Sequence, residues 1–311
     1  MRPILNAVLA AVVCIFSYQV TAAPTAPKSV TIGFIPGENP QALQENGEAI
    51  AKLLQAKIGV PVNIYVGKSY AELVDAMAAK KVDFAFLSAM TFVFAEKKAG
   101  AKVLLKKVWE SPYYYATILS RGDQKLTKLS QLKGKRFAFV DDQSASGYLY
   151  PEVYFKKSGI DPKSFFSEVI FSGNHTESIK LLREGKVDAV AVFSNDAKGK
   201  ETAWERFPGV GAGVGDGTAA QKLKSLKKPN RIWVSEPIPN DPFCVRQEFY
   251  DSNPKIAHEL MFALLELDGD ATEGANFKKL LGVSSLKIAT TQQYEPVREM
   301  VKALDLKPEG K

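Results

Sequence analysis

Histidine and cysteine, the side chains that most often bind transition metals, are scarce in this sequence. The chain has two of each among 311 residues, and the histidines, His175 and His258, lie far apart in sequence. A zinc site needs several such ligands close together, so we expect no metal ion and no cofactor. Cys14 lies in an N-terminal segment that we expect to be removed, which leaves Cys244 without an intrachain disulfide partner. The apolar neighbours of Cys244 favour a buried, unreactive thiol.

Long apolar runs are absent beyond the N-terminus. The first residues combine Arg2, an apolar run over 4–16 and the small-residue sequence Val20-Thr21-Ala22. This order is typical of a secretory signal peptide, here residues 1–22, with cleavage after Ala22. The apolar run is shorter than the about 20 residues that a membrane-spanning helix needs. We therefore expect an exported protein without a membrane span.

A dense basic segment interleaved with aromatic residues is also missing. The chain has 41 lysines and arginines against 34 aspartates and glutamates, a formal net charge of +7, and its lysines are scattered. This pattern does not predict nucleic-acid binding. A mild positive field does favour the approach of small anions.

Strand-like and helix-like segments alternate along the chain. Strand patterns cover 30–35, 61–66, 82–87, 103–108, 113–119, 137–140, 168–171, 187–193 and 231–235. Helix patterns cover 41–57, 70–80, 129–132, 151–158 and 175–184, and we expect helices to fill the C-terminal part to about residue 306. The alternation predicts an α/β fold with parallel or mixed sheets between helices.

One sequence pattern occurs twice and indicates two lobes. Residues 76–85 and 180–189 each run from a helix through a basic turn into a Val-Asp-apolar strand. We expect the chain to cross between two similar lobes near Leu119 and again near Ser235. Lobe 1 is then residues 28–118 plus 237–311, and lobe 2 is residues 119–236. Ligands of open α/β sheets bind beyond the carboxyl ends of the strands, so we expect the ligand in the cleft between the lobes.

The turn at 141–148, Asp-Asp-Gln-Ser-Ala-Ser-Gly-Tyr, is the clearest candidate for a ligand site. It follows the apolar strand pattern 136–140 and precedes a predicted helix over 148–157. Such a junction places free backbone N–H groups, two serine hydroxyls and the positive end of a helix dipole around one point. The turn is therefore suited to bind a tetrahedral oxyanion. Its Ser-x-Ser-Gly part, residues 144–147, contains nothing that could transfer a phosphoryl group or hold magnesium.

Together with this turn, further segments resemble the family of phosphonate-, phosphite- and phosphate-binding periplasmic proteins of ABC importers. The resemblance extends over about 30–306, and its order and spacing are more specific than any one motif. The matching pieces are Ser69-Tyr70-Ala71, Val82-Asp83-Phe84-Ala85, Ser111-Pro112-Tyr113-Tyr114-Tyr115, Asp142 to Tyr148 with Pro151, Gly173-Asn174-His175, Val187-Asp188-Ala189 and the run Ser235 to Pro242.

The resemblance implies a two-lobe periplasmic binding protein of type II, located in the periplasm, with the ligand in an interlobe cleft that closes by hinge motion. It implies that Ser144, Ala145 (through its backbone) and Ser146 hold the oxygens bound to phosphorus. It adds Tyr70, Tyr114 and His175 to this oxyanion cage. Asp241 and a polar group near Asn195 would face the rest of the ligand. The implied partner is an ABC permease in the inner membrane, and we expect the protein itself to be a monomer.

Two departures from the family pattern concern ligand choice. The family commonly has threonine where this chain has Ala145, so one hydroxyl is missing from the turn. Binders of aminoalkylphosphonates place a glutamate for the ammonium group where this chain has Asn195 or, one residue on, Asp196. An amine-bearing ligand is therefore less expected, although Asp241 offers another carboxylate.

The sequence leaves other interpretations open. Ser146, His175 and Asp241 could form a catalytic triad on paper, but the serine is in no Gly-x-Ser-x-Gly turn, so we do not expect an enzyme. The ligand could be another small anion, such as a sulfonate, or the protein could dock as a free receptor on a membrane sensor. Each candidate side chain could also be structural: His175 could cap its helix, and Tyr113 and Tyr115 are expected to pack rather than bind.

Overall fold

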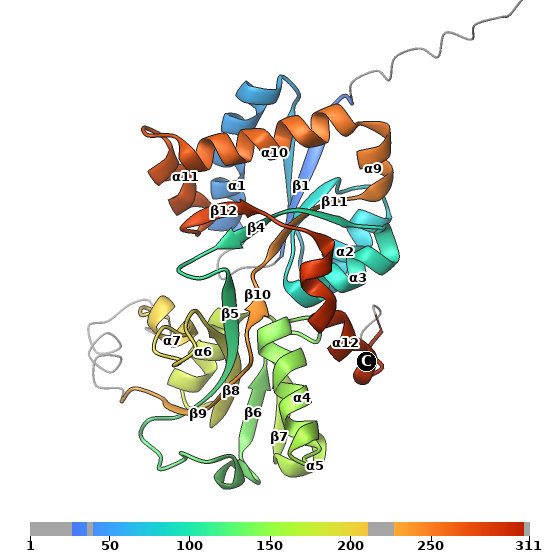
Figure 1. Ribbon diagram of the computed structural model, residues 1–311. Helices are drawn as coiled ribbons and strands as arrows, with labels where there is room; N and C mark the ends of the chain where they lie inside the picture. Colours follow the sequence, from blue (N-terminus) through green and yellow to red (C-terminus); the bar gives the residue numbers. More distant parts are fainter. Residues whose placement is uncertain (1–26, 36–39, 211–226, 308–311) are drawn as a thin grey trace, which may run out of the picture.

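Two six-stranded mixed sheets with helices packed against them form two lobes in the computed structural model (Figure 1), which describes residues 27–35, 40–210 and 227–307. The predicted signal peptide lies outside these residues. The first sheet has the order β12-β4-β11-β3-β1-β2, and the second has the order β10-β5-β8-β6-β7, with β9 also paired to β5. The α/β fold class predicted from the sequence is confirmed.

The first lobe contains the chain's N-terminal and C-terminal parts. Its strands are β1 (Val30–Phe34), β2 (Val62–Val66), β3 (Phe84–Phe86), β4 (Lys102–Val108), β11 (Pro242–Val245) and β12 (Ser285–Ile288). Its helices are α1 (Pro40–Ile58), α2 (Tyr70–Ala78), α3 (Ala89–Ala99), α9 (Gln247–Ser252), α10 (Pro254–Gly269), α11 (Gly274–Leu281), η3 (Thr291–Tyr294) and α12 (Glu295–Ala303). The strand β1 runs parallel to β2 and β3, and β11 is antiparallel to β3, so the carboxyl ends of β1 and β3 meet at one edge.

The second lobe is built from the middle of the chain. Its strands are β5 (Tyr113–Ser120), β6 (Arg136–Phe139), β7 (Glu168–Phe171), β8 (Ala189–Ser194), β9 (Asn230–Val234) and β10 (Ile238–Pro239). Its helical segments are η1 (Leu129–Leu132), η2 (Ala145–Leu149), α4 (Tyr150–Lys157), α5 (Pro162–Phe165), α6 (His175–Arg183) and α7 (Ala203–Arg206). The strand β6 is parallel to both β7 and β8, which again brings carboxyl ends together at one edge.

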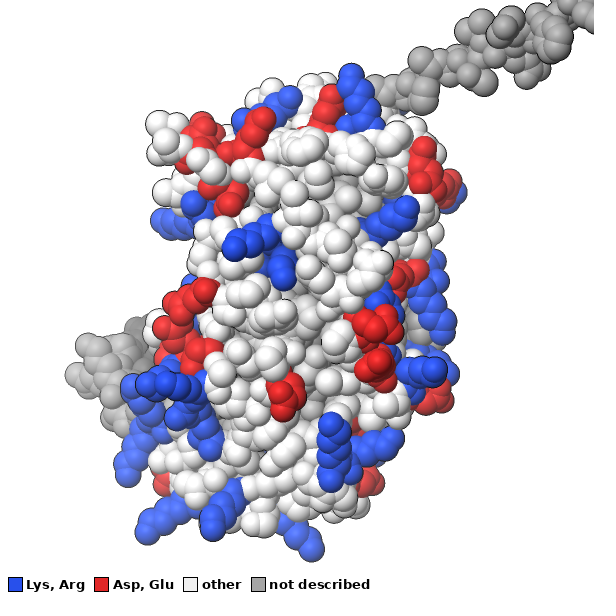
Figure 2. Space-filling view, viewed as in Figure 1, with Lys and Arg blue, Asp and Glu red and all other residues white. Residues whose placement is uncertain are grey.

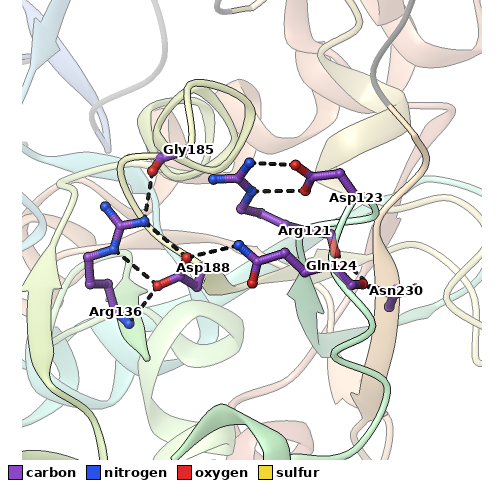
Figure 3. A network of polar contacts seen from close by, with 7 residues as sticks. All are labelled: Arg121, Asp123, Gln124, Arg136, Gly185, Asp188 and Asn230. Carbon is purple, nitrogen blue, oxygen red and sulfur yellow. Dashed lines mark hydrogen bonds and ion pairs between the residues drawn. The ribbon is translucent and has the colours of Figure 1, made fainter. Parts of the chain in front are cut away.

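The repeated Val-Asp pattern fixes the start of a strand in each lobe. The Asp188 carboxylate accepts a hydrogen bond from the Arg136 backbone N–H at 3.0 Å and two from its guanidinium at 3.0 and 2.9 Å (Figure 3). In the first lobe, Asp83 accepts from the Thr31 N–H at 3.0 Å and from the Arg246 guanidinium at 2.9 Å. Each aspartate thus joins its own strand to the neighbouring parallel strand through charge-assisted hydrogen bonds, which contribute about 1.5–3 kcal/mol each.

One apolar cluster joins the two lobes, and each lobe has a further cluster of its own. One buried cluster includes Leu73 and Phe92 from α2 and α3 together with Phe137 and Leu149 from the second lobe. The hydroxyls of Ser88 and Thr91, at the start of α3, both donate to the Gln143 carbonyl of the second lobe at 3.2 Å. The lobes therefore meet beside the turn that precedes η2.

The structure corrects three details of the sequence interpretation. We placed the crossings near Leu119 and Ser235, but the whole of β5 pairs within the second sheet, so the chain leaves the first sheet between β4 and β5 and returns between β10 and β11. The apolar sequence of β5 would fit either sheet, and only its pairing with β8 assigns it to the second sheet. The helix α3 was not predicted, because its sequence is apolar on most faces. The C-terminal part contains the strand β12 where we expected only helices.

Candidate ligand-binding site

A cavity of about 330 Å³ lies between the two lobes. Its walls contain seven of the eight residues predicted from the sequence, namely Tyr70, Tyr114, Ser144, Ser146, His175, Asn195 and Asp241. The eighth, Ala145, is buried in η2 and does not line the cavity. The fold thus brings together residues that are far apart in sequence, and their part in binding stays a prediction.

The serine turn begins directly after β6 and leads into η2 and α4. Ser144 is the N-cap, and its hydroxyl accepts a hydrogen bond from the Gly147 N–H at 3.0 Å. The first N–H groups of such a helix have no partner within the helix and carry its positive partial charge. A Cβ atom at Gly147 would lie 2.4 Å from the Val140 Cβ, so only glycine lets the turn lie this close to the strand end.

Two buried tyrosines from different elements meet the two serines. Tyr70, the first residue of α2, is 3% exposed and faces Ser144 across the lobes, and Tyr114 of β5 is 6% exposed and faces Ser146. Burial raises the pKa of both phenols, as does the nearby charge of Asp241, and the neighbouring serine hydroxyls oppose this only in part. Both hydroxyls are therefore protonated at neutral pH and available as neutral donors.

Three consecutive tyrosines follow Pro112, and one of them reaches the cavity. Tyr113 is 45% exposed and lies under the Lys106 ammonium, 5.5 Å from its ring centroid. Neither Tyr113 nor Tyr115 lines the cavity. The alternation of side chains along β5 therefore leaves Tyr114 as the tyrosine of this segment that faces the site.

His175 contributes a neutral imidazole. It is the first residue of α6, whose N-cap is Asn174, accepting from the Glu177 N–H at 2.8 Å, so His175 is not the cap. Burial lowers the pKa of His175 to about 3, and its ring packs edge-on against Phe193 at 5.0 Å. Its Nδ1 atom is buried and has no hydrogen-bond partner among the described residues. A buried ring nitrogen without a partner favours a ligand that would supply one.

The polar group near position 195 is Asn195 itself. Asn195 lines the cavity, whereas the Asp196 carboxylate accepts from the backbone N–H groups of Lys198, Lys200 and Glu201 at 2.7–2.8 Å. Asp196 is therefore committed to its own loop. The sequence could not separate these two neighbours, because the choice depends on how the loop after β8 turns.

Sequence reasoning missed two cations of the cavity wall, Lys107 and Arg206. Lys107 lies on β4, and its backbone N–H donates to the Asp241 carbonyl at 2.9 Å, which places both side chains at the same edge of the sheet. Burial lowers the pKa of Lys107 and raises that of Asp241 to about 6, and the two charges oppose these shifts. The adjacent Lys106 made the sequence ambiguous, since strand alternation alone does not say which lysine faces the cleft.

Other classes of site were also considered over the described ranges. No group of three or more histidine, cysteine, aspartate or glutamate side chains in these ranges could hold a metal ion. None of their helices is long and apolar enough to cross a membrane. Cys244 is buried, and burial raises the pKa of its thiol well above the usual value, which does not favour a nucleophile.

Comparison with known proteins gives a consistent picture. Residues 32–294 match the family described as the periplasmic substrate-binding protein of phosphonate ABC transporters. The chain is 25% identical over 280 residues to the phosphonates-binding periplasmic protein of Escherichia coli, covering 88% of this chain and 76% of that protein. It is 30% identical over 187 residues to a phosphate-import protein of Mycolicibacterium smegmatis, covering 56% of this chain and 58% of that protein, which is less than two thirds of its length.

Solved structures show the same fold. A binding-protein component of a phosphonate ABC transporter from Pseudomonas aeruginosa has a TM-score of 0.73 at 22% identity, covering 88% of this chain and 85% of that one. The Prochlorococcus marinus protein PhnD1, solved in complex with methylphosphonate, has a TM-score of 0.74 at 18% identity, covering 89% and 98%. At these identities the likeness establishes the fold alone.

Proposed function

This chain belongs to the family of periplasmic substrate-binding proteins of phosphonate ABC transporters, and from that premise we propose that it captures a phosphonate, phosphite or phosphate in its interlobe cavity. The captured ligand is delivered to an ABC permease in the inner membrane. The residues that we propose as ligands are Tyr70, Tyr114, Ser144, Ser146, His175, Asn195 and Asp241, together with the backbone N–H of Ala145.

The observation that carries this proposal is the convergence of neutral donors on one helix start. Two serines and two tyrosines from both lobes line one cavity, and the two serines belong to the turn that opens η2. Neutral donors and a helix N-terminus can hold an oxyanion in a water-poor site without an arginine beside it. A ligand held in this way joins the two lobes, because Tyr70 belongs to one and the serines to the other.

Binding without chemistry is part of the proposal. A serine triad requires a histidine oriented by a carboxylate through one ring nitrogen. The His175 Nδ1 has no partner among the described residues, and burial keeps the ring neutral. These features suit a donor or acceptor for a bound anion rather than a general base. An assay with phosphate and phosphonate esters that detects hydrolysis, lost on Ser146→Ala, would contradict this part of the proposal.

We further propose that the protein acts in the periplasm as a monomer, after cleavage behind Ala22, and does not bind nucleic acid. Cations and acids are mixed over both lobes on the face in Figure 2, a pattern that supports the last point. Hinge closure of the two lobes on the ligand fits the fold. Small-angle scattering should therefore show a more compact particle when ligand is added.

The experiment that tests the function is a thermal-shift panel on the purified protein. A ligand that binds the native state stabilises it by RT ln(1 + L/Kd), where L is the free ligand concentration, so the melting temperature rises as L exceeds Kd. We expect a shift with at least one of methylphosphonate, phosphite and phosphate, reduced in the Ser144→Ala and Ser146→Ala variants. A panel in which these three give no shift while an alkanesulfonate does would refute the proposal.

A further inference from the structure

The cavity wall beyond the serine turn carries more positive than negative charge. Three charged side chains line the cavity: Lys107 and Asp241 from the first lobe and Arg206 from the second. With Asp241 ionised the sum is one positive charge. An oxyanion held by neutral donors at the serine turn does not need this cation, so its role requires a separate explanation.

Lys107 is half-buried at the cleft and makes no ion pair with a described residue. Burial lowers the pKa of its ammonium, and the nearby charge of Asp241 opposes this effect. Its ammonium lies 5.0 Å from the centroid of the Phe86 ring, and no carboxylate of the described residues comes within ion-pair distance of it. Lysines elsewhere on the molecule do find partners, such as Lys80 with Glu248 at 2.7 Å and Lys98 with Asp75 at 2.5 Å. A half-buried cation without an ion pair has lost part of its hydration, and an anion arriving in the cavity would offset that cost.

Arg206 faces the same cavity from the other lobe. It ends the short helix α7, its side chain is exposed, and its guanidinium makes no hydrogen bond or ion pair with a described residue. The donors of this guanidinium are therefore free to bind a carboxylate, for which their planar geometry is suited. A ligand that reached both Lys107 and Arg206 would be bound by both lobes at its second end as well.

The size of the cavity allows a second group on the ligand. Its volume of about 330 Å³ falls in the range of pockets that enclose organic molecules, about 300–1,000 Å³, rather than a bare oxyanion. Trp109 and Phe207 add apolar surface to the cavity wall, which suits a short alkyl linker.

We propose that Lys107 is a specificity-determining residue that, with Arg206, binds an anionic second group of the ligand, so that the site prefers carboxyalkyl phosphonates to aminoalkyl phosphonates. This inference rests on the proposed function, because it assumes that the phosphonate end occupies the serine turn. A carboxylate on the ligand would bring one negative charge to a cavity wall whose net charge is +1, whereas an ammonium group would be repelled by Lys107 and Arg206.

The test is calorimetric titration with a matched pair of ligands. 3-Phosphonopropionate and 2-aminoethylphosphonate both carry a charged group at the end of a two-carbon linker. Close charge pairs in interfaces couple by about 1.5 kcal/mol or more, which is about tenfold in affinity. We expect the wild-type protein to bind 3-phosphonopropionate at least about tenfold more tightly, and Lys107→Met to reduce that ratio by about tenfold.

Lys106→Met is the matched control, because Lys106 lies next to Lys107 on β4, carries the same charge and does not line the cavity. We expect it to retain the wild-type ratio. Should Lys107→Met not fold, Lys107→Arg is expected to keep the preference, and the exposed Arg206→Met to reduce it. An unchanged ratio in Lys107→Met, or in Arg206→Met, would overturn the assignment.

Methylphosphonate has no second charged group, so its binding tests the proposed function separately from the preference for a carboxylate. If methylphosphonate binds but 3-phosphonopropionate binds no more tightly than 2-aminoethylphosphonate, the inference is wrong and the proposed function stands. If methylphosphonate, phosphite and phosphate all fail to bind, the proposed function fails and the inference fails with it.

Discussion

Replacing Tyr114 by phenylalanine should weaken oxyanion binding strongly, while the same change at its two neighbours should not. Tyr114 is 6% exposed, lines the cavity and faces Ser146. The substitution removes one hydroxyl and keeps the ring, so the packing against Trp109, 6.2 Å away, is preserved. The loss therefore reports the hydroxyl alone.

The magnitude follows from the bond that is lost. A hydrogen bond to a charged group contributes about 1.5–3 kcal/mol. At about 1.4 kcal/mol for each factor of ten, Tyr114→Phe should raise Kd by roughly 10- to 150-fold. Tyr113→Phe and Tyr115→Phe, which change residues outside the cavity wall, should stay within about threefold of wild type.

The assay is isothermal titration with methylphosphonate, with circular dichroism melts to show that all three variants fold. A loss for Tyr115→Phe equal to that for Tyr114→Phe would refute the orientation of β5 on which the site depends. A Tyr114→Phe variant with wild-type affinity would remove this phenol from the oxyanion cage.

Three further predictions concern stability and protons. Gly147→Ala should lower the free energy of unfolding by about 1–3 kcal/mol and weaken ligand binding, because the added Cβ would overlap Val140. The control is Gly269→Ala, where no atom lies within 4 Å of the added Cβ, and it should be neutral or slightly stabilising in urea melts. Asp188→Asn should lower the free energy of unfolding by about 1–3 kcal/mol at pH 7. Burial raises the pKa of Asp188, but the hydrogen bonds from Arg136 outweigh burial and hold the pKa below its usual value, so the stabilisation is present above about pH 4 and is lost as pH falls through the lower native pKa. An equal loss of stability in acid for Asp188→Asn would contradict this. Burial raises the pKa of Asp241 to about 6 against the opposing charge of Lys107, and a bound anion should raise this pKa further. Ligand binding near pH 6 should then take up protons, which calorimetry detects as a heat that depends on the buffer. Proton uptake of the same size in Asp241→Asn would argue against this role of Asp241.

Much of the fold was predictable because local patterns agree with the tertiary structure. An apolar run located the strand β6, a period-3.6 pattern located the helix α1, and the repeated Val-Asp pattern indicated two lobes. The family resemblance, which the family match confirms, added the type II arrangement. Sequence patterns failed where strand pairing or burial between the lobes determines the structure. The helix α3 is apolar on most faces because it lies between the lobes, and β5 could belong to either sheet until its partner is known.

The candidate site shows the same division. The serine turn was visible in sequence because glycine and two serines at a strand-to-helix junction have a local meaning. Lys107 was not visible, because its role depends on the pairing of β4 with β11, a strand that lies more than a hundred residues away. Contacts of this kind bring charges together without leaving a motif in the sequence.

A crystal structure of the protein with methylphosphonate would show whether the serine turn holds a phosphorus oxyanion between the lobes. We expect phosphonate oxygens within hydrogen-bonding distance of the Ser144 and Ser146 hydroxyls, with the Tyr70 and Tyr114 phenols as further donors. Ligand density elsewhere, for example in the separate cavity lined by Tyr148 and Phe171 on the second lobe, with the serine turn empty, would contradict this expectation.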